Sequence, residues 1–202
     1  DQVSLGVNEG DKIGLIGVNG TGKTTFLKIV AGLEESDEGE VVMNKEATVA
    51  YLPQNPEFLP GDTVLEYVVR DKKSSNENWS LEAEAKAILN NLNEYEYDKA
   101  IDNLSGGEKK RIALARTLVS PASILIMDEP TNHLDSGMVL WMEQYLAKYK
   151  GVLIMVTHDR YFLDRVTNKI VEIDKAKLYS YEANYSGYLE LRAQRIDSEL
   201  AT

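Results

Sequence analysis

The chain has 202 residues, 43% of them hydrophobic, and its 33 acidic and 22 basic residues give a net charge of −11. This length and hydrophobic content suffice for one globular core, while the negative charge disfavours broad contact with a nucleic-acid backbone. The absence of cysteine excludes a disulfide framework and a thiolate metal site, which fits a reducing compartment. The longest apolar runs are far shorter than the roughly 20 residues of a membrane-spanning helix, and no signal peptide is evident. We therefore expect no integral membrane segment and a cytoplasmic location.

The two ends of the sequence lack the marks of natural termini. The chain begins at Asp1 without a methionine and ends at Thr202 within a stretch that reads as a helix. We therefore expect it to be part of a longer protein.

The first predicted elements frame a glycine-rich loop. Residues 12–17 read as a buried strand, and apolar residues after the loop recur with helical spacing until Gly32, a residue type that commonly ends helices. Two short β-rich runs follow, at residues 41–43 and 48–52, with a turn-like trio between them. We expect these runs to form an antiparallel hairpin.

A group of helices is predicted next. Thr63 and Glu66 have the spacing of a capping box. The polar residues 71–78 lack apolar periodicity and indicate a loop, and Ser80 is placed to cap a further helix. Another helix follows a Ser-Gly-Gly turn. We expect a helical subdomain over about residues 62–119.

Two continuous apolar runs indicate buried strands, one at residues 124–127 and the other at residues 152–157. Apolar residues with helical spacing lie between them and indicate a helix. Buried strands joined by helices imply a parallel sheet with both faces covered. The sequence therefore predicts an α/β fold, with a mainly parallel central sheet, a small antiparallel β part and the helical subdomain.

The glycine-rich loop matches the phosphate-binding pattern GxxxxGK[ST] from Gly17 to Thr24, between a predicted strand and a predicted helix. Glycines allow successive backbone N–H groups to converge on phosphate, and the helix N-terminus adds partial positive charge. We expect Lys23 to bridge the β- and γ-phosphates and the Thr24 hydroxyl to ligate Mg²⁺. An ordinary glycine turn is the alternative interpretation. The expected nucleotide contacts are Gly17, Asn19, Gly20, Thr21, Gly22, Lys23, Thr24 and Thr25.

Two carboxylates follow the strand at residues 124–127. Asp128 stands at the carboxyl end of that strand, where open α/β sheets bind ligands, and we expect it to hold Mg²⁺ directly or through water. Glu129 is adjacent and is a candidate general base that polarises the attacking water. Alone, the pair fits a solvated turn equally well, but the intact phosphate loop favours the catalytic interpretation.

Two further side chains are candidates for the same site. His158 follows the strand at residues 152–157, at the same sheet edge as Asp128, and we expect it to contact the γ-phosphate and hold the attacking water in line. A lone histidine is more often structural, and the second histidine, His133, carries no assigned role. Gln54 ends another predicted strand and can offer a carbonyl to Mg²⁺ or to the water, although by itself it is a weak signal.

Residues 104–108, Leu-Ser-Gly-Gly-Glu, add a second anion site ahead of a helix. The first site cannot use this turn, so we expect it to serve a second nucleotide site. The order of phosphate loop, Leu-Ser-Gly-Gly-Glu and acidic strand end resembles a nucleotide-binding domain of the ATP-binding cassette superfamily over nearly the whole chain.

More narrowly, the chain resembles the ABC-F family. Transporter cassettes usually carry a different residue pair where Asn132 and His133 stand, and a less aromatic stretch after the second histidine. The motifs that carry this resemblance are Glu129-Pro130-Thr131-Asn132-His133-Leu134-Asp135, Thr157-His158-Asp159-Arg160-Tyr161-Phe162-Leu163-Asp164 and Asn184-Tyr185-Ser186-Gly187-Tyr188.

The resemblance implies that Ser105, Gly106 and Gly107 bind the γ-phosphate on the opposite cassette, and that Asp135 lies in the loop linking the two sites. It implies an ATPase that uses ATP and Mg²⁺ and needs a second cassette, in the same chain or in a homodimer. It further implies an ATP-driven clamp that acts on the ribosome or RNA through parts outside this sequence. Finally, it implies the first cassette of a Uup-type protein, in which residues 186–202 begin the linker between cassettes.

The sequence departs from the family pattern in two places. The aromatic residue that stacks on adenine in the family would precede this sequence, so the base contacts are unassigned. Many first cassettes carry a long helical arm between the glutamine loop and the Ser-Gly-Gly turn, yet only the polar residues 71–79 stand there. Two other functions stay open: the energy-coupling subunit of a membrane ABC transporter, and a DNA-acting ABC-F ATPase.

Two groups of side chains beyond the motifs are expected to be structural. A tyrosine cluster near the C-terminus could stack on RNA bases, but the acidic composition favours packing of a terminal hairpin and helix. A basic run after the Ser-Gly-Gly turn is expected on a solvated helix face. The groups are Tyr179, Tyr181, Tyr185 and Tyr188, and Lys109, Lys110 and Arg111, respectively.

Overall fold

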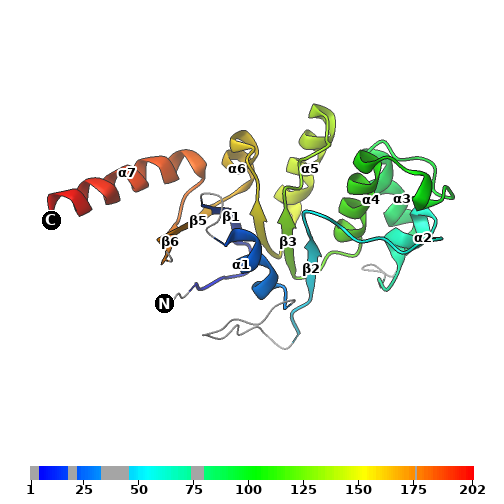
Figure 1. Cartoon of the computed structure of the whole chain (residues 1–202), viewed down its shortest axis with the longest axis horizontal. Coiled ribbons are helices and arrows are strands. Elements are labelled where there is room, and N and C mark those ends of the chain that lie inside the picture. Colours follow the sequence, from blue (N-terminus) through cyan, green and yellow to red (C-terminus); the bar gives the residue numbers. More distant parts are fainter. Residues whose placement is uncertain (1–4, 18–21, 33–45, 74–79, 176) are drawn as a thin grey trace.

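The computed structural model describes residues 5–17, 22–32, 46–73, 80–175 and 177–202, and these contain one six-stranded sheet (Figure 1). The strand order is β2-β3-β4-β1-β5-β6. The first five strands of that order are parallel, and β6 pairs antiparallel with β5 at one edge. The strands are β1 (Lys12–Ile16), β2 (Val49–Leu52), β3 (Ile124–Asp128), β4 (Val152–Val156), β5 (Lys169–Asp174) and β6 (Lys177–Tyr181).

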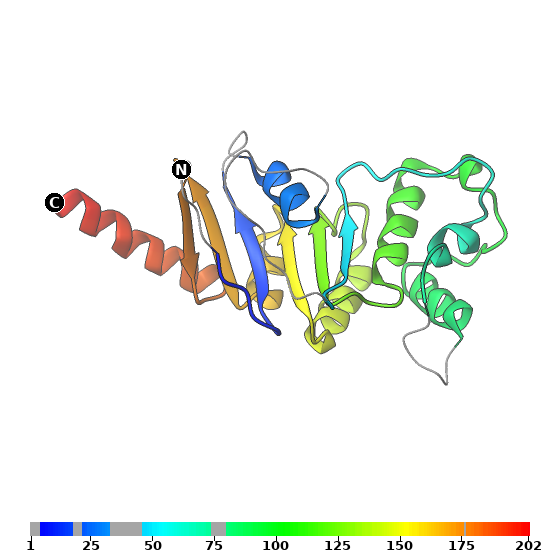
Figure 2. The same cartoon turned by 90° about the horizontal axis from the view of Figure 1, so that it is seen from below.

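Helices cover both faces of this sheet, as the continuous apolar strands predict. Along β3, Ile126 faces a cluster that includes Leu27 of α1 (Lys23–Val30). The neighbouring residues Leu125 and Met127 face a second cluster, which includes residues of α5 (Ser136–Lys148) and α6 (Arg160–Val166). Figures 1 and 2 show α1 on one side of the sheet and α5 and α6 on the other. Both faces of β3 are therefore buried, which explains why its residues do not alternate in polarity.

The helical group lies beyond β2, at one end of the sheet (Figure 1). The hydroxyl of Thr63 accepts a hydrogen bond from the backbone N–H of Glu66 at 3.2 Å, and the hydroxyl of Ser80 accepts one from Ala83 at 3.0 Å, so both residues cap helices as predicted. The helices of this group are α2 (Val64–Val69), α3 (Leu81–Asn91), the 3-10 turn η1 (Ile101–Asn103) and α4 (Gly106–Leu118).

The predicted hairpin of residues 41–43 and 48–52 is tested only in its second half, because residues 41–43 lie outside the described residues. Val49–Leu52 form β2, which pairs in parallel with β3 over residues 124–127. This strand therefore belongs to the main sheet. The antiparallel part of the described fold is the pair of β5 and β6.

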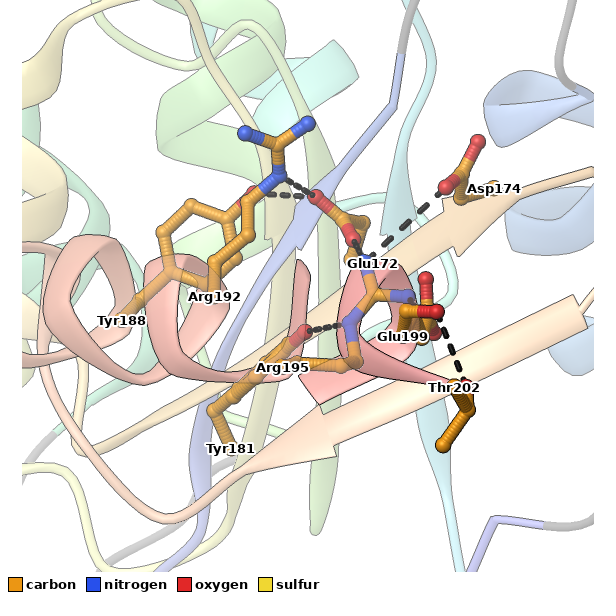
Figure 3. A network of polar contacts seen from close by, with 8 residues as sticks. All are labelled: Glu172, Asp174, Tyr181, Tyr188, Arg192, Arg195, Glu199 and Thr202. Carbon is orange, nitrogen blue, oxygen red and sulfur yellow. Dashed lines mark hydrogen bonds and ion pairs between the residues drawn. The ribbon is translucent and has the colours of Figure 1, made fainter. Parts of the chain in front are cut away.

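The last helix, α7 (Tyr185–Ala201), is attached to the sheet by a buried carboxylate (Figure 3). Glu172 of β5 accepts hydrogen bonds from Arg192 at 3.0 Å, from Arg195 at 2.8 Å and from the hydroxyl of Tyr188. The rings of Tyr181 and Tyr188 meet edge to face, with centroids 5.1 Å apart, and both residues are buried. The packing role predicted for this part of the tyrosine cluster is thus confirmed. Within the described ranges, no helix is both long enough and apolar enough to cross a membrane.

Candidate nucleotide-binding and hydrolysis site

The phosphate-loop motif lies between β1 and α1, where the sequence predicts it. Gly22 has φ 91°, a left-handed conformation that L side chains rarely adopt, and α1 begins at the next residue. Lys23, Thr24 and Thr25 therefore form the first turn of α1, whose N-terminal N–H groups and dipole favour an anion. Gly17 directly follows β1. The candidates Asn19, Gly20 and Thr21 lie outside the described residues.

Thr24 and Asp128 are brought together across 104 residues of sequence. The Thr24 hydroxyl donates to Oδ2 of Asp128 at 3.3 Å, from the start of α1 to the end of β3. Asp128 is buried, and burial raises the pKa of its carboxyl, while the Thr24 hydrogen bond and the electrostatic influence of Lys23 and His158 act in the opposite direction. Burial is the largest of these influences, so a bound cation would offset the cost of the buried charge.

The donor set at this point fits Mg²⁺. A threonine hydroxyl and an aspartate carboxylate are hard oxygen ligands, and Mg²⁺ takes one or two carboxylates together with substrate phosphates. Among the described residues, no three His, Asp or Glu side chains cluster closely enough to hold a metal by themselves. A metal here would therefore depend on nucleotide phosphates for its remaining ligands, as the pairing with a phosphate loop requires.

Glu129 adopts an unusual backbone conformation that directs its side chain to β4. Its φ is 54°, and its N–H donates to the carbonyl of Val156 at 2.7 Å, which extends the pairing of β3 with β4 by one residue. Its carboxylate accepts from the backbone N–H of His158 at 3.3 Å and lies 3.2 Å from the His158 Nε2. A non-glycine residue held in this region stores strain, a condition that clusters at functional sites.

A cavity of about 20 Å³ lies next to these carboxylates. This volume is enough for one water molecule, and the wall offers several polar partners. The structure thus brings three of the predicted residues, Gln54, Asp128 and Glu129, to a single cavity. The cavity is lined by Leu52, Pro53, Gln54, Pro56, Lys110, Asp128, Glu129, Pro130 and Asn132.

The Ser-Gly-Gly turn forms the N-terminus of α4. Ser105 caps the helix through the N–H of Glu108 at 3.2 Å, and the Glu108 carboxylate reaches back to the Ser105 N–H at 3.4 Å. Gly106 and Gly107 form the first turn. In both overall views β2 and β3 lie between α1 and α4, so this turn stands apart from the phosphate loop of its own chain (Figures 1 and 2).

Asp135 caps α5, since its carboxylate accepts from the N–H of Met138 at 2.9 Å. The turn before it contains His133, with φ 66°. The sequence-based expectation of a solvated helix face at residues 109–111 is wrong for Arg111. Its side chain is 21% exposed, pairs with Glu94 and donates to the carbonyl of His133 at 3.1 Å. The one sequence signal for these contacts is that residue 111 is an arginine beside two lysines. The planar guanidinium of arginine can bind two acceptors at once.

Comparison with known proteins yields a matching family model and several relatives of this chain. The family model described as "ABC transporter" matches residues 1–132. The YfmR protein of Bacillus subtilis, an uncharacterized ABC transporter ATP-binding protein, is 40% identical over 96% of this chain and 37% of its own length. The energy-dependent translational throttle protein EttA of Escherichia coli K12 is 37% identical over 98% of this chain and 42% of its own. The chain thus spans about two fifths of the length of these relatives.

The alignments with these relatives cover 231 and 234 positions, more than the 202 residues of this chain. The relatives therefore carry residues that this chain lacks.

Two solved structures share the fold. The post-hydrolysis dimer of the cassette MJ0796 bound to ADP and Pi has a TM-score of 0.75 and 25% identity, over 89% of this chain and 88% of its own. ABCE1 in a model of ribosome-bound archaeal Pelota and ABCE1 has a TM-score of 0.73 and 31% identity, over 92% of this chain and 32% of its own.

Proposed function

Because the chain belongs to the ATP-binding cassette family, we propose that it is an ATP-binding and ATP-hydrolysing cassette of an ABC-F type protein, working as an ATP-driven clamp. The observation that carries this proposal is the meeting of Gln54, Asp128 and Glu129 at one water-sized cavity, with Asp128 hydrogen-bonded to Thr24 of the phosphate-loop motif. The similarity to the EttA proteins agrees with the ABC-F assignment.

ATP binding is assigned to the turn between β1 and α1. Backbone N–H groups around Gly22 and the N-terminus of α1 would hold the phosphates, and Lys23 would neutralise the β- and γ-phosphates. Mg²⁺, when bound, supplies charge neutralisation at the phosphates. Thr24, Asp128 and Gln54 are its proposed protein ligands. The full proposed set of nucleotide contacts is Gly17, Asn19, Gly20, Thr21, Gly22, Lys23, Thr24 and Thr25.

Hydrolysis is assigned to Glu129 and His158. Phosphoryl transfer needs little covalent help from the protein and depends on positioning and charge. Glu129 would take the proton of a water in the adjacent cavity, and Gln54 would orient that water. The Glu129 carboxylate contacts both the backbone N–H and the imidazole of His158. Binding of ATP would draw His158 to the γ-phosphate and leave the carboxylate to the water.

The complete site requires a second cassette. Ser105, Gly106 and Gly107 would bind the γ-phosphate held by the partner cassette, and Asp135 would lie between the two sites. The separation of α4 from α1 supports this division, because one chain does not bring both phosphate sites together. We assign residues 62–119 as the helical subdomain and 186–202 as the start of a linker to a second cassette. Closure of the two cassettes then assembles the catalytic site, and hydrolysis releases it.

The proposed target is the ribosome. This rests on relatives named as translational throttle proteins and on a structural neighbour that is bound to the ribosome. The acidic net charge of −11 argues that contact with RNA is made by parts outside this chain.

Co-sedimentation tests the target. The full-length protein that contains this chain would carry Glu129→Gln, and would be pelleted with ribosomes with and without ATP. ATP-dependent retention is expected, because the variant would bind ATP without releasing the closed form. The same protein with Lys23→Ala added should lose that retention. Absence of retention in a protein that binds ATP would redirect the assignment to a DNA or membrane-transporter partner.

A further inference from the structure

Arg111 joins three separate segments of the chain. It extends from α4, one turn beyond the Ser-Gly-Gly residues. Its Nε and Nη2 lie 3.2 and 3.1 Å from one carboxylate oxygen of Glu94, which follows α3, and its Nη1 donates to the carbonyl of His133 at 3.1 Å. One guanidinium therefore connects the helical group to the turn that follows Glu129.

The ion pair with Glu94 restrains the orientation of the Arg111 guanidinium. The Glu94 side chain is 10% exposed, and burial raises the pKa of its carboxyl while Arg111 lowers it. A buried carboxylate requires its cation, since removal of the partner leaves an uncompensated charge. The guanidinium is thereby held in one orientation, and its remaining donor is directed at His133.

The hydrogen bond from Arg111 to the His133 carbonyl reaches a residue with an uncommon backbone conformation. His133 has φ 66°, a left-handed conformation that is uncommon for residues with a side chain. The turn also lies against the Ser-Gly-Gly segment: a Cβ added to Gly107 would stand 3.4 Å from the His133 Nδ1 and 3.6 Å from the Arg111 Nη1. Gly107 and His133 thus pack together, with the guanidinium beside both.

We propose that Arg111 is a positioning residue, which holds the Ser105–Gly107 turn and the His133–Asp135 turn as one rigid unit toward the second cassette. This inference rests on the proposed function, because both turns are assigned there to the opposite site. A donor fixed by Glu94 keeps the two turns in register, so that closure presents both at once. Loss of the bond would let each turn move by itself and misplace groups that act on the partner's γ-phosphate.

The first variant to test is Arg111→Lys in the full-length protein. Lysine keeps a positive charge for Glu94 but lacks the fork that reaches two acceptors. We expect kcat for ATP to fall on the order of tenfold to a hundredfold, as small misplacements of reacting groups do. ATP binding to the phosphate loop of the open cassette should not change, because that loop is on another element. A kcat equal to that of the wild type overturns the proposal.

A double variant separates positioning from charge neutralisation. Arg111→Gln should lower both the thermal midpoint and kcat, and adding Glu94→Gln should restore the midpoint by removing the buried charge. The double variant should remain slow. If kcat recovers together with the midpoint, Arg111 serves only to neutralise Glu94. The matched control is Arg116→Gln on the same helix, whose guanidinium binds the carbonyls of Tyr67 and Arg70. It should lower the midpoint and leave kcat unchanged.

Hydrogen exchange provides a readout independent of activity. Arg111→Lys should raise amide exchange in residues 105–108 and 131–135 together, with no change at α1. Unchanged exchange in these two segments overturns the rigid unit. A wild-type protein that neither binds nor hydrolyses ATP sinks the proposed function, and the exchange result then still decides whether Arg111 joins the two turns.

Discussion

The Glu129 carboxylate lies against His158 by two contacts, one oxygen accepting from the backbone N–H at 3.3 Å and the other lying 3.2 Å from the imidazole Nε2. The Glu129 side chain is 10% exposed and the His158 side chain 74%, so the histidine covers the carboxylate from the solvent side. The pair links the ends of β3 and β4. In the proposed function this covering residue would meet an incoming γ-phosphate.

His158→Ala should therefore slow hydrolysis without preventing ATP binding. A single donor to the transition state is worth on the order of a hundredfold to a thousandfold in kcat, and the phosphate loop would still hold the nucleotide. Steady-state phosphate release and equilibrium ATP binding, measured on the full-length protein, check the two parts. Tyr161→Ala is the control, because this α6 side chain is 76% exposed. Equal losses in both variants would argue against a specific role for the imidazole.

Lys23→Ala should act on affinity itself. Its ammonium stands in the first turn of α1, where it would neutralise phosphate charge together with the helix dipole. ATP binding should weaken by at least about tenfold, as expected for loss of a charge-assisted contact of about 1.5–3 kcal/mol. Lys28→Ala, in the last turn of the same helix, is the matched control. Normal affinity in Lys23→Ala would overturn the assignment of the phosphate loop.

Asp128→Asn should stabilise the protein when no nucleotide is present. Burial raises the folded-state pKa of this carboxyl above its ordinary value of 3.8, so the folded state binds a proton more readily than the unfolded state. Stability therefore falls as the pH rises from 3.8 through the folded pKa, and the penalty is complete above the folded pKa. The variant should melt higher at neutral pH but lose the stabilisation that ATP with Mg²⁺ gives to the wild type.

Asp164, whose pKa is shifted in the opposite direction, provides a control for the Asp128 experiment. The hydroxyl of Ser186 donates to the Asp164 carboxylate and so does its N–H, at 2.8 Å, and these two hydrogen bonds lower the pKa of that carboxyl. Its contribution to stability is present above the unfolded pKa and is lost as the pH falls through the folded pKa. Asp164→Asn should therefore melt lower at neutral pH. A lower midpoint in Asp128→Asn as well would contradict the assignment of a desolvation penalty to Asp128.

Arg195→Gln should loosen α7 from the sheet. Arg195 donates to Glu172 at 2.8 Å (Figure 3). Its guanidinium also lies 3.8 Å from the centroid of the Tyr179 ring. Since Arg192 and Tyr188 still bind Glu172, the expected cost is about 2 kcal/mol, less than for a fully unpaired charge. Denaturant unfolding checks this value. Lys86→Gln, which breaks an exposed pair with Glu82, should leave the unfolding midpoint nearly unchanged.

The sequence predicts much of this fold because local signals and burial agree. The apolar run at residues 124–127 is buried on both faces, and the capping residues Thr63, Ser80 and Ser105 begin helices. The parallel pairing of β2 was not predicted, because a short strand carries no local mark of its partner. Strand order is a property of packing and cannot be read from spacing alone.

The candidate site, like the fold, could be predicted from the sequence only in part. Asp128 and His158 follow neighbouring strand ends, so their common sheet edge follows from the parallel arrangement. The contact between Glu129 and His158 depends on strand register and on the left-handed backbone at Glu129, neither of which has a sequence signature. Arg111 was misassigned for a similar reason, since its partners Glu94 and His133 lie 17 and 22 residues away.

The most direct test of the central claim is a paired measurement on the full-length Glu129→Gln protein, of ATP retained after rapid separation and of phosphate released. Loss of the general base should lower turnover by at least about a hundredfold, while the intact phosphate loop keeps ATP bound. The matched variant is Glu143→Gln, a carboxylate on α5 that pairs with Arg165. Wild-type turnover in Glu129→Gln would contradict the assignment of Glu129 and, with it, the proposed hydrolytic site.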